Sequence, residues 1–228
     1  EIARAIRREV GDDFHLQMKI SGTDYNNAVF PWEGRGNSLD ESIKVCQWLE
    51  QDGVNAFHVS SGSMFPHPRN PPGGLPMDVL RNTYAGMAAS GRHTVRNFLL
   101  FRMWPTGPFF SWWWRHRGGP IIQGISLDDA RLIKRAVSVP VISTGGYQSA
   151  SVVNRALEDG DCDAISIARS LLANPDLLKI WEGGADQPER PCTYCNKCLV
   201  NGTMNPIGCY ELSRFDSPKQ MIQGIYSI

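Results

Sequence analysis

The sequence predicts an α/β fold with a parallel sheet, equivalent to the C-terminal half of a (β/α)₈ TIM barrel. In its 228 residues, four short apolar runs typical of strands alternate with segments of helical periodicity. Such alternation is typical of parallel strands joined by right-handed helical crossovers. A complete barrel of this class needs roughly 250 residues and eight strands, so four strands make one half.

The first predicted unit is a strand, a helix and a second strand. His15 to Ile20 alternates polar and apolar side chains, which favours a strand. Ser38 and Glu41 have the spacing of a capping box, and helical periodicity follows them. Ala56 to Ser60 is the second predicted strand. Together these segments predict one complete β-α-β unit.

The first ten residues predict the end of a helix, with Ile2, Ala5, Ile6 and Val10 on its apolar face. This stretch is charged and does not have the pattern of a signal peptide. The chain also lacks the run of about 18 apolar residues that a membrane span needs. We therefore expect a cytoplasmic protein. Because the first residue is Glu1 and not Met, we expect the chain to be part of a longer one.

Residues 63–120 interrupt the regular series as a long insertion. They hold much of the proline and glycine and the run Trp112 to Trp114. We expect a helix over residues 76–90 and a strand over residues 98–103. An insertion of this length in a compact domain is usually a lid or a binding loop. Its aromatic side chains equally suit the contact surface of a homo-oligomer, and both interpretations stay open.

Regular units resume beyond the insertion. Ser126 is expected to cap a helix that runs to Ala136. The remaining predicted elements are a strand over 139–143, a helix over 149–158, a strand over 164–167 and a helix over 174–181. A last helix is expected over residues 214–228.

Two successive strand ends carry groups that suit a phosphate. Gly145 and Gly146 follow one strand, and glycine lets backbone N–H groups approach an anion closely. Ala168 and Arg169 follow the next strand and add a further N–H and a guanidinium fork. In a TIM barrel, phosphates are often held after the last two strands. The pattern predicts a phosphate clamp.

These strand ends resemble a known family. The run from Val139 to Gly146 and the run from Asp163 to Leu177 resemble the last two barrel strands of the Old Yellow Enzyme family of NAD(P)H:flavin oxidoreductases. Residues 19–21 and 58–62 resemble its fifth and sixth strands. The resemblance extends over essentially the whole chain and is weakest in residues 63–120.

The resemblance implies FMN as the cofactor, with its phosphate at Gly145, Gly146, Ala168 and Arg169. It places Lys19 at the N1/O2 edge of the flavin, where a cation stabilises the reduced ring. The family usually has glycine where this chain has Ala168. The implied reaction takes hydride from NAD(P)H onto FMN and passes it to an electron-poor alkene.

The resemblance also implies what this chain lacks. In the family, the pair that binds the substrate carbonyl and the tyrosine that donates a proton come from the earlier half of the barrel, and nothing here matches them. We therefore expect residues 1–183 to be the C-terminal half of a flavin barrel without the catalytic acid. As an isolated piece, it should bind FMN weakly and aggregate through exposed strand edges.

Residues 184–228 form a second segment with four closely spaced cysteines. Cys192, Cys195, Cys198 and Cys209 follow the pattern C-x₂-C-x₂-C-x₁₀-C, which favours an iron–sulfur cluster. Zinc, which more often uses two separate cysteine pairs, and unliganded thiols remain alternatives. The 2,4-dienoyl-CoA reductase-like subset of the resembled family carries a [4Fe–4S] cluster at this place, so the resemblance implies the same here.

The balance of charged residues bears on which partners the chain can have. Lys and Arg total 23, as do Asp and Glu, so no net charge steers the chain toward nucleic acid or an anionic membrane. Cys46 and Cys162 lie apart from the four cysteines and are interpreted as packed thiols. A lyase or isomerase on another phosphate-binding barrel, and a non-catalytic module around a zinc-bound cysteine segment, remain as alternatives to the flavin enzyme.

Overall fold

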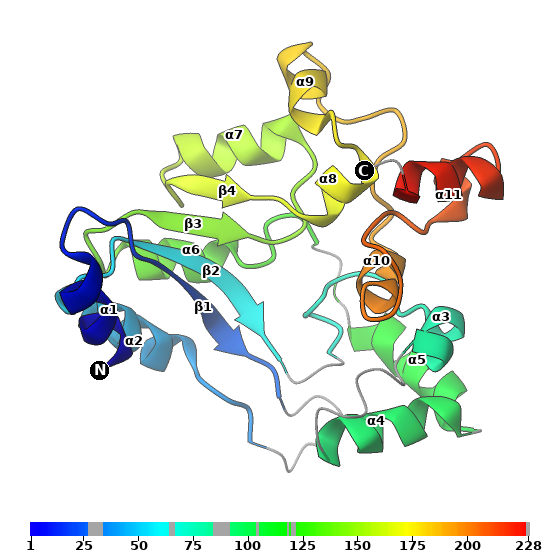
Figure 1. The fold of residues 1–228 in the computed structure, drawn as a ribbon, viewed down its shortest axis with the longest axis horizontal. Coiled ribbons are helices and arrows are strands. Elements are labelled where there is room, and N and C mark those ends of the chain that lie inside the picture. Colours follow the sequence, from blue (N-terminus) through cyan, green and yellow to red (C-terminus); the bar gives the residue numbers. More distant parts are fainter. Residues whose placement is uncertain are drawn as a thin grey trace.

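A computed structural model describes residues 1–26, 34–63, 67–83, 92–103, 105–117, 119 and 122–226 (Figure 1). In these residues the strands form one parallel sheet in the order of the sequence, β1-β2-β3-β4. Its members are β1 (Gln17–Asp24), β2 (Ala56–Gly62), β3 (Val141–Thr144) and β4 (Ala164–Ser166). The predicted partial barrel of four parallel strands is confirmed.

Helices that follow the expected pattern pack on one face of this sheet. They are α1 (Ile2–Val10), α2 (Leu39–Gln51) and α6 (Leu127–Lys134), while α7 (Ala150–Glu158) connects β3 to β4. The main core joins α1, α2 and α6 to the sheet, with Phe57, Val59 and Val141 fully buried. Since side chains alternate along a strand, the residues between these three face the other side. A row of Lys19, His58, Ile142 and Ala164 crosses that inner face in register.

Helix starts show how local sequence fixes these elements. Ser38 and Glu41 form the predicted capping box, with both reciprocal hydrogen bonds present. Ser126 occupies the N-cap position of α6, but its side chain makes no cap bond and instead shares a hydrogen bond with the Ser61 hydroxyl. In α1, the expected apolar face is partly wrong, since Ala3 is buried and Ile2 is 76% exposed.

The insertion is helical. It contains α3 (Met77–Thr83), α4 (Arg92–Arg102) and α5 (Thr106–Arg117). The expected helix over 76–90 is confirmed as far as Thr83, and residues 84–90 lie outside the described residues. The strand expected over 98–103 is wrong, because these residues belong mainly to α4. A short apolar run suits either structure, and here Phe101 is buried against Phe110 of α5, 5.5 Å between ring centroids.

The C-terminal part also differs from expectation. The helix expected over 174–181 is confirmed from Leu177, as α9 (Leu177–Glu182). A short helix that was not expected, α8 (Arg169–Ala173), precedes it and ends before Pro175. Beyond them lie α10 (Lys197–Asn201), a 3₁₀ turn η2 (Leu212–Arg214) and α11 (Pro218–Tyr226). The last helix therefore starts at Pro218 and not at residue 214.

A second core lies beyond the strand ends. Leu80, Phe101 and Phe110 of the insertion bury against Val200 of α10, so the cysteine segment and the insertion pack together. Figure 1 shows the strand arrowheads on the side of the sheet nearer to α10. No helix in the described ranges has the length and apolar character that crossing a membrane requires.

Candidate functional site at the strand ends

A cavity of about 290 Å³, partly open to solvent, lies at the carboxyl ends of the strands. All five residues predicted to bind the flavin line it: Lys19, Gly145, Gly146, Ala168 and Arg169. Its other walls include Ser60 and Ser61 at the end of β2, and residues 69–72 of the insertion. The structure thus brings the predicted residues together, because parallel strands end at one edge of the sheet.

The glycine pair is fixed by close packing. Gly145 and Gly146 have φ angles of 150° and 68°. A Cβ on Gly146 would lie 2.8 Å from the Ile122 carbonyl oxygen, and one on Gly145 would lie 3.0 Å from the Ile125 amide nitrogen. Only glycine fits this turn without a shift. Within the described part of the chain, no backbone acceptor meets the N–H groups of either glycine, so the turn fits an anion.

Arg169 has a more specific environment than the sequence indicated. Its Nη1 donates to the Pro72 carbonyl at 2.6 Å and to Oδ1 of Asn196, and its guanidinium lies over the Tyr194 ring, 5.4 Å from the centroid. No carboxylate pairs with it among the described residues. Burial lowers the pKa of Arg169, while the nearby Cys192 thiol opposes that shift.

Lys19 and His58 are neighbours on the inner face. Lys19 is exposed, and the parallel register places it opposite His58 on β2. Nε2 of His58 is buried and has no hydrogen-bond partner in the part of the chain that the structure describes. Burial lowers the pKa of His58, and Lys19 lowers it further. His58 lies beside Lys19 on the inner face of the sheet but does not itself line the cavity.

A group that the sequence analysis missed lies beside these strand ends. Tyr25 stacks on His67 with centroids 4.8 Å apart. The Arg69 amide N–H donates to Nδ1 of His67 at 2.9 Å, and Nη1 of Arg69 donates to the Tyr25 hydroxyl at 3.2 Å. Burial, with Arg69 and Arg35 nearby, lowers the pKa of His67 to about 4. The ring is therefore neutral at pH 7, and its proton resides on Nε2 because Nδ1 accepts a hydrogen bond.

The four clustered cysteines line a second, much smaller cavity of about 10 Å³, which is about the space of one water molecule. Cys192, Cys195, Cys198 and Cys209 all line it as free thiols. Burial raises the pKa of Cys192 and Cys195, and raises that of Cys198 to about 11. Among the described residues, however, no three metal-ligating side chains converge as a metal site. The donor set suits iron or zinc in chemical type, but these positions do not form a closed coordination shell.

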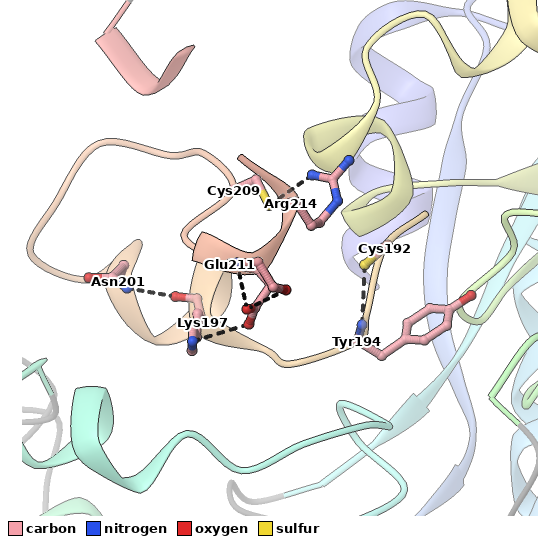
Figure 2. Close-up of polar contacts among 8 residues, drawn as sticks. Cys192, Tyr194, Lys197, Asn201, Cys209, Glu211 and Arg214 are labelled. Carbon is pink, nitrogen blue, oxygen red and sulfur yellow. Dashed lines mark hydrogen bonds and ion pairs between the residues drawn. The ribbon is translucent and has the colours of Figure 1, made fainter. Parts of the chain in front are cut away.

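A buried arginine stands beside this cavity (Figure 2). Arg214 is 9% exposed and donates from Nη1 to Sγ of Cys209 at 3.1 Å. Its remaining donors meet the carbonyls of Ala173, Arg190 and Pro191 and Oδ1 of Asn174. A positive charge so enclosed favours an anionic group in the cysteine cavity.

The two isolated cysteines are packed thiols, as predicted. Cys46 is fully buried in the main core, and Cys162 is 2% exposed. Burial raises the pKa of the Cys46 thiol to about 11 and raises that of Cys162 as well. Their burial agrees with the prediction that both are packed thiols.

Known proteins resemble this chain over most of its length. Residues 120–217 match the family model described as Dihydrouridine synthase (Dus). The chain is 40% identical over 199 residues to a bilirubin reductase of Mediterraneibacter gnavus, covering 87% of this chain and 24% of that protein. It is 24% identical over 221 residues to an NADH oxidase of Thermoanaerobacter brockii, covering 92% and 26% of the two chains.

Solved structures agree on the fold. A 2-naphthoyl-CoA reductase complex matches with a TM-score of 0.59 at 21% identity, covering 91% of this chain and 24% of that one. Histamine dehydrogenase from Rhizobium sp. 4-9 matches with a TM-score of 0.55 at 18% identity, covering 97% and 24%. The chain thus spans about a quarter of the length of its relatives.

The fold and the strand-end cavity define part of a TIM-type barrel. Its relatives include a multifunctional alkene reductase/demethylase OYE of Caballeronia cordobensis, 23% identical over 215 residues and covering 92% of this chain and 24% of that protein. The fold and these relatives support an Old Yellow Enzyme-like family of the NADH:flavin oxidoreductase type, in agreement with the resemblance seen in the sequence.

Proposed function

We propose that this chain supplies the C-terminal, FMN-binding half of the barrel of an oxidoreductase that moves hydride from NAD(P)H, through FMN, to an activated alkene. One observation carries the proposal: the five predicted residues, one within β1 and four just beyond the ends of β3 and β4, line a single cavity. Sequence relatives named as reductases and an NADH oxidase support the redox class. The FMN, when bound, supplies the hydride chemistry.

The phosphate of FMN would be held where β3 and β4 end. The Gly145 and Gly146 amides offer N–H donors, and the Ala168 and Arg169 amides begin a short helix. Substituting alanine for the family's usual glycine at position 168 retains the backbone donor. Arg169 adds positive charge on the same wall, so the site combines directional donors with a cation.

Lys19 would stabilise negative charge on the flavin ring. It lies on the inner face of β1, opposite His58, and makes no ion pair within the described residues. A cation in this place strengthens its interaction as the ring becomes reduced, which favours hydride acceptance.

His67 would offer a further hydrogen-bond donor beside the cavity, which it does not itself line. Its Nε2–H is a neutral donor, held in this tautomer by the hydrogen bond from Arg69 to Nδ1. A neutral donor with a fixed orientation suits a substrate carbonyl, which gains negative charge as hydride arrives. The earlier half of the barrel remains the expected source of the catalytic acid.

For the cysteine segment we propose a [4Fe–4S] cluster held by Cys192, Cys195, Cys198 and Cys209. The spacing, the shared cavity and the enclosed Arg214 support an anionic centre. Zinc on the same thiolates would satisfy the same charge. Ligand-quality geometry would require the cysteine side chains to turn inward when the centre is assembled.

The test is anaerobic purification of the full-length protein, followed by an absorbance spectrum and mass spectrometry of the released cofactor. The proposal expects FMN, with about four iron and four sulfide per chain. Lys19→Met should slow flavin reduction at least tenfold, whereas Lys219→Met, on an exposed lysine of α11, should not. A colourless protein would support a lyase or isomerase instead, and zinc without sulfide would remove the cluster.

A further inference from the structure

We infer that Tyr194 and Asn196, in the cysteine segment, are positioning residues that hold together two walls of the flavin-phosphate end of the cavity. One wall is the loop Pro71–Pro72 of the insertion, and the other is the turn at Gly146. Neither Tyr194 nor Asn196 lines the cavity, so both act through the residues they hold. The inference rests on the proposed function.

Asn196 holds the first wall, the loop Pro71–Pro72, in place through hydrogen bonds. It is 3% exposed, and its amide nitrogen lies 2.8 Å from the Gly74 carbonyl oxygen and 3.3 Å from that of Pro72. Its Oδ1 accepts from Arg169, whose Nη1 also donates to the Pro72 carbonyl at 2.6 Å. One buried amide thus holds both the insertion loop and the arginine of the phosphate site. Loss of such an amide leaves several buried polar groups without partners.

Tyr194 fastens the second wall. Its side chain is almost fully buried, and its hydroxyl donates to the Gly146 carbonyl. Its ring lies under the Arg169 guanidinium. Its backbone carbonyl accepts from the Gly74 amide at 2.8 Å, which ties the same residue to the insertion loop. Figure 2 shows the Tyr194 ring extending away from the side where Cys209 and Arg214 lie.

The backbone around these two residues is adapted to this close approach. Tyr194 and Asn196 have φ angles of 53° and 61°, in the left-handed region that is uncommon for residues other than glycine. A Cβ on Gly73 would lie 2.1 Å from the Tyr194 carbonyl oxygen. The insertion loop therefore touches the cysteine segment backbone to backbone. Polar ties across such a contact fix the distance between the two walls.

Loss of the hydrogen bonds made by Tyr194 and Asn196 should affect binding of the FMN phosphate and not binding of the flavin ring. FMN and riboflavin share the ring and the ribityl chain, and only FMN has the phosphate. Displacing Pro72, Gly146 or Arg169 would disturb the groups that meet the phosphate and leave the ring site at Lys19 intact. Loss of the side-chain hydrogen bonds of either residue should therefore reduce the preference for FMN over riboflavin, which a general loss of folding would not do.

The test uses the full-length protein freed of flavin, with FMN and riboflavin affinities measured by quenching of flavin fluorescence. Tyr194→Phe removes one hydroxyl and keeps the ring, and we expect FMN to bind about 5-fold more weakly. Asn196→Gly removes the amide and tolerates the positive φ, and we expect a loss of about 10-fold or more. Riboflavin affinity should change less than about twofold in both.

Matched controls are Tyr226→Phe and Asn154→Ala, both on exposed helix positions, which should keep the wild-type preference. Unchanged FMN affinity in Tyr194→Phe and Asn196→Gly would overturn the inference, as would an equal loss of both flavins. A wild-type protein that binds neither flavin would instead overturn the proposed function, and the inference with it. Selective loss of FMN binding in both variants supports it.

Discussion

The sheet and the region beyond its strand ends are built by different kinds of contact. In the sheet, each strand pairs with the next one along the chain, and the main core fills the space under α1, α2 and α6. In the second region, hydrogen bonds join Asn196 to Gly74 and Thr203 to Thr83, more than a hundred residues apart in each case. The sheet provides the frame, and long-range polar contacts shape the site on it.

The largest expected effect lies in the sheet. Phe57→Ala on β2 empties a fully buried position in the main core and should cost about 3–5 kcal/mol of the free energy of unfolding. Urea denaturation of the full-length protein measures it. Phe109→Ala, at a 59% exposed position of α5, should cost less than about 1 kcal/mol. Equal costs would contradict the idea of one dominant core.

The next effect lies at the contact between the insertion and the cysteine segment. Gly73→Ala combines a φ of 115° with a Cβ placed 2.1 Å from the Tyr194 carbonyl oxygen, and should cost about 2–3 kcal/mol. Gly160→Ala shares the positive φ but meets nothing within 4 Å, so it should cost about 1 kcal/mol. Thermal unfolding of both variants gives the difference. Similar losses of stability in the two variants would mean that the insertion loop can shift away from Tyr194 at little energetic cost.

The pH dependence of stability should distinguish the sheet from the region beyond its strand ends, which contains His67. The folded-state pKa of His67 is lowered to about 4 from 6.5, so the stability linked to its neutral form is complete above pH 6.5 and is lost as the pH falls toward 4. With solvent screening, we expect a loss of at most about 2 kcal/mol. His67→Asn should flatten this dependence, and His116→Asn, at an exposed site, should not. Parallel pH profiles for all three proteins would contradict it.

The smallest effect tests a local signal. Ser38→Ala removes the capping box of α2 and should cost about 1 kcal/mol in urea denaturation. Ser151→Ala, an exposed position in the first turn of α7, should change stability by less than about 0.5 kcal/mol. A Ser38→Ala variant as stable as the wild type would show that packing alone fixes the start of α2.

Sequence reasoning predicted the sheet and the cavity because both depend on local signals. Strand and helix periodicity predicted the units, and the ends of successive parallel strands indicated Gly146 and Arg169. Lys19, which lies within β1, was indicated only by the family resemblance. It failed where tertiary contacts decide. The apolar run at 98–103 is helical because Phe101 packs on Phe110. The His67 group was missed because its stacking on Tyr25 cannot be read from spacing.

A comparison of the affinities for FMN and riboflavin tests the role of Arg169 most directly. Arg169 is the cation proposed to bind the FMN phosphate, so wild-type full-length protein should bind FMN at least about tenfold more tightly than riboflavin. In Arg169→Met, the two affinities measured by fluorescence quenching should converge. An undiminished preference for FMN in this variant would contradict the assignment of the phosphate to the strand ends of β3 and β4.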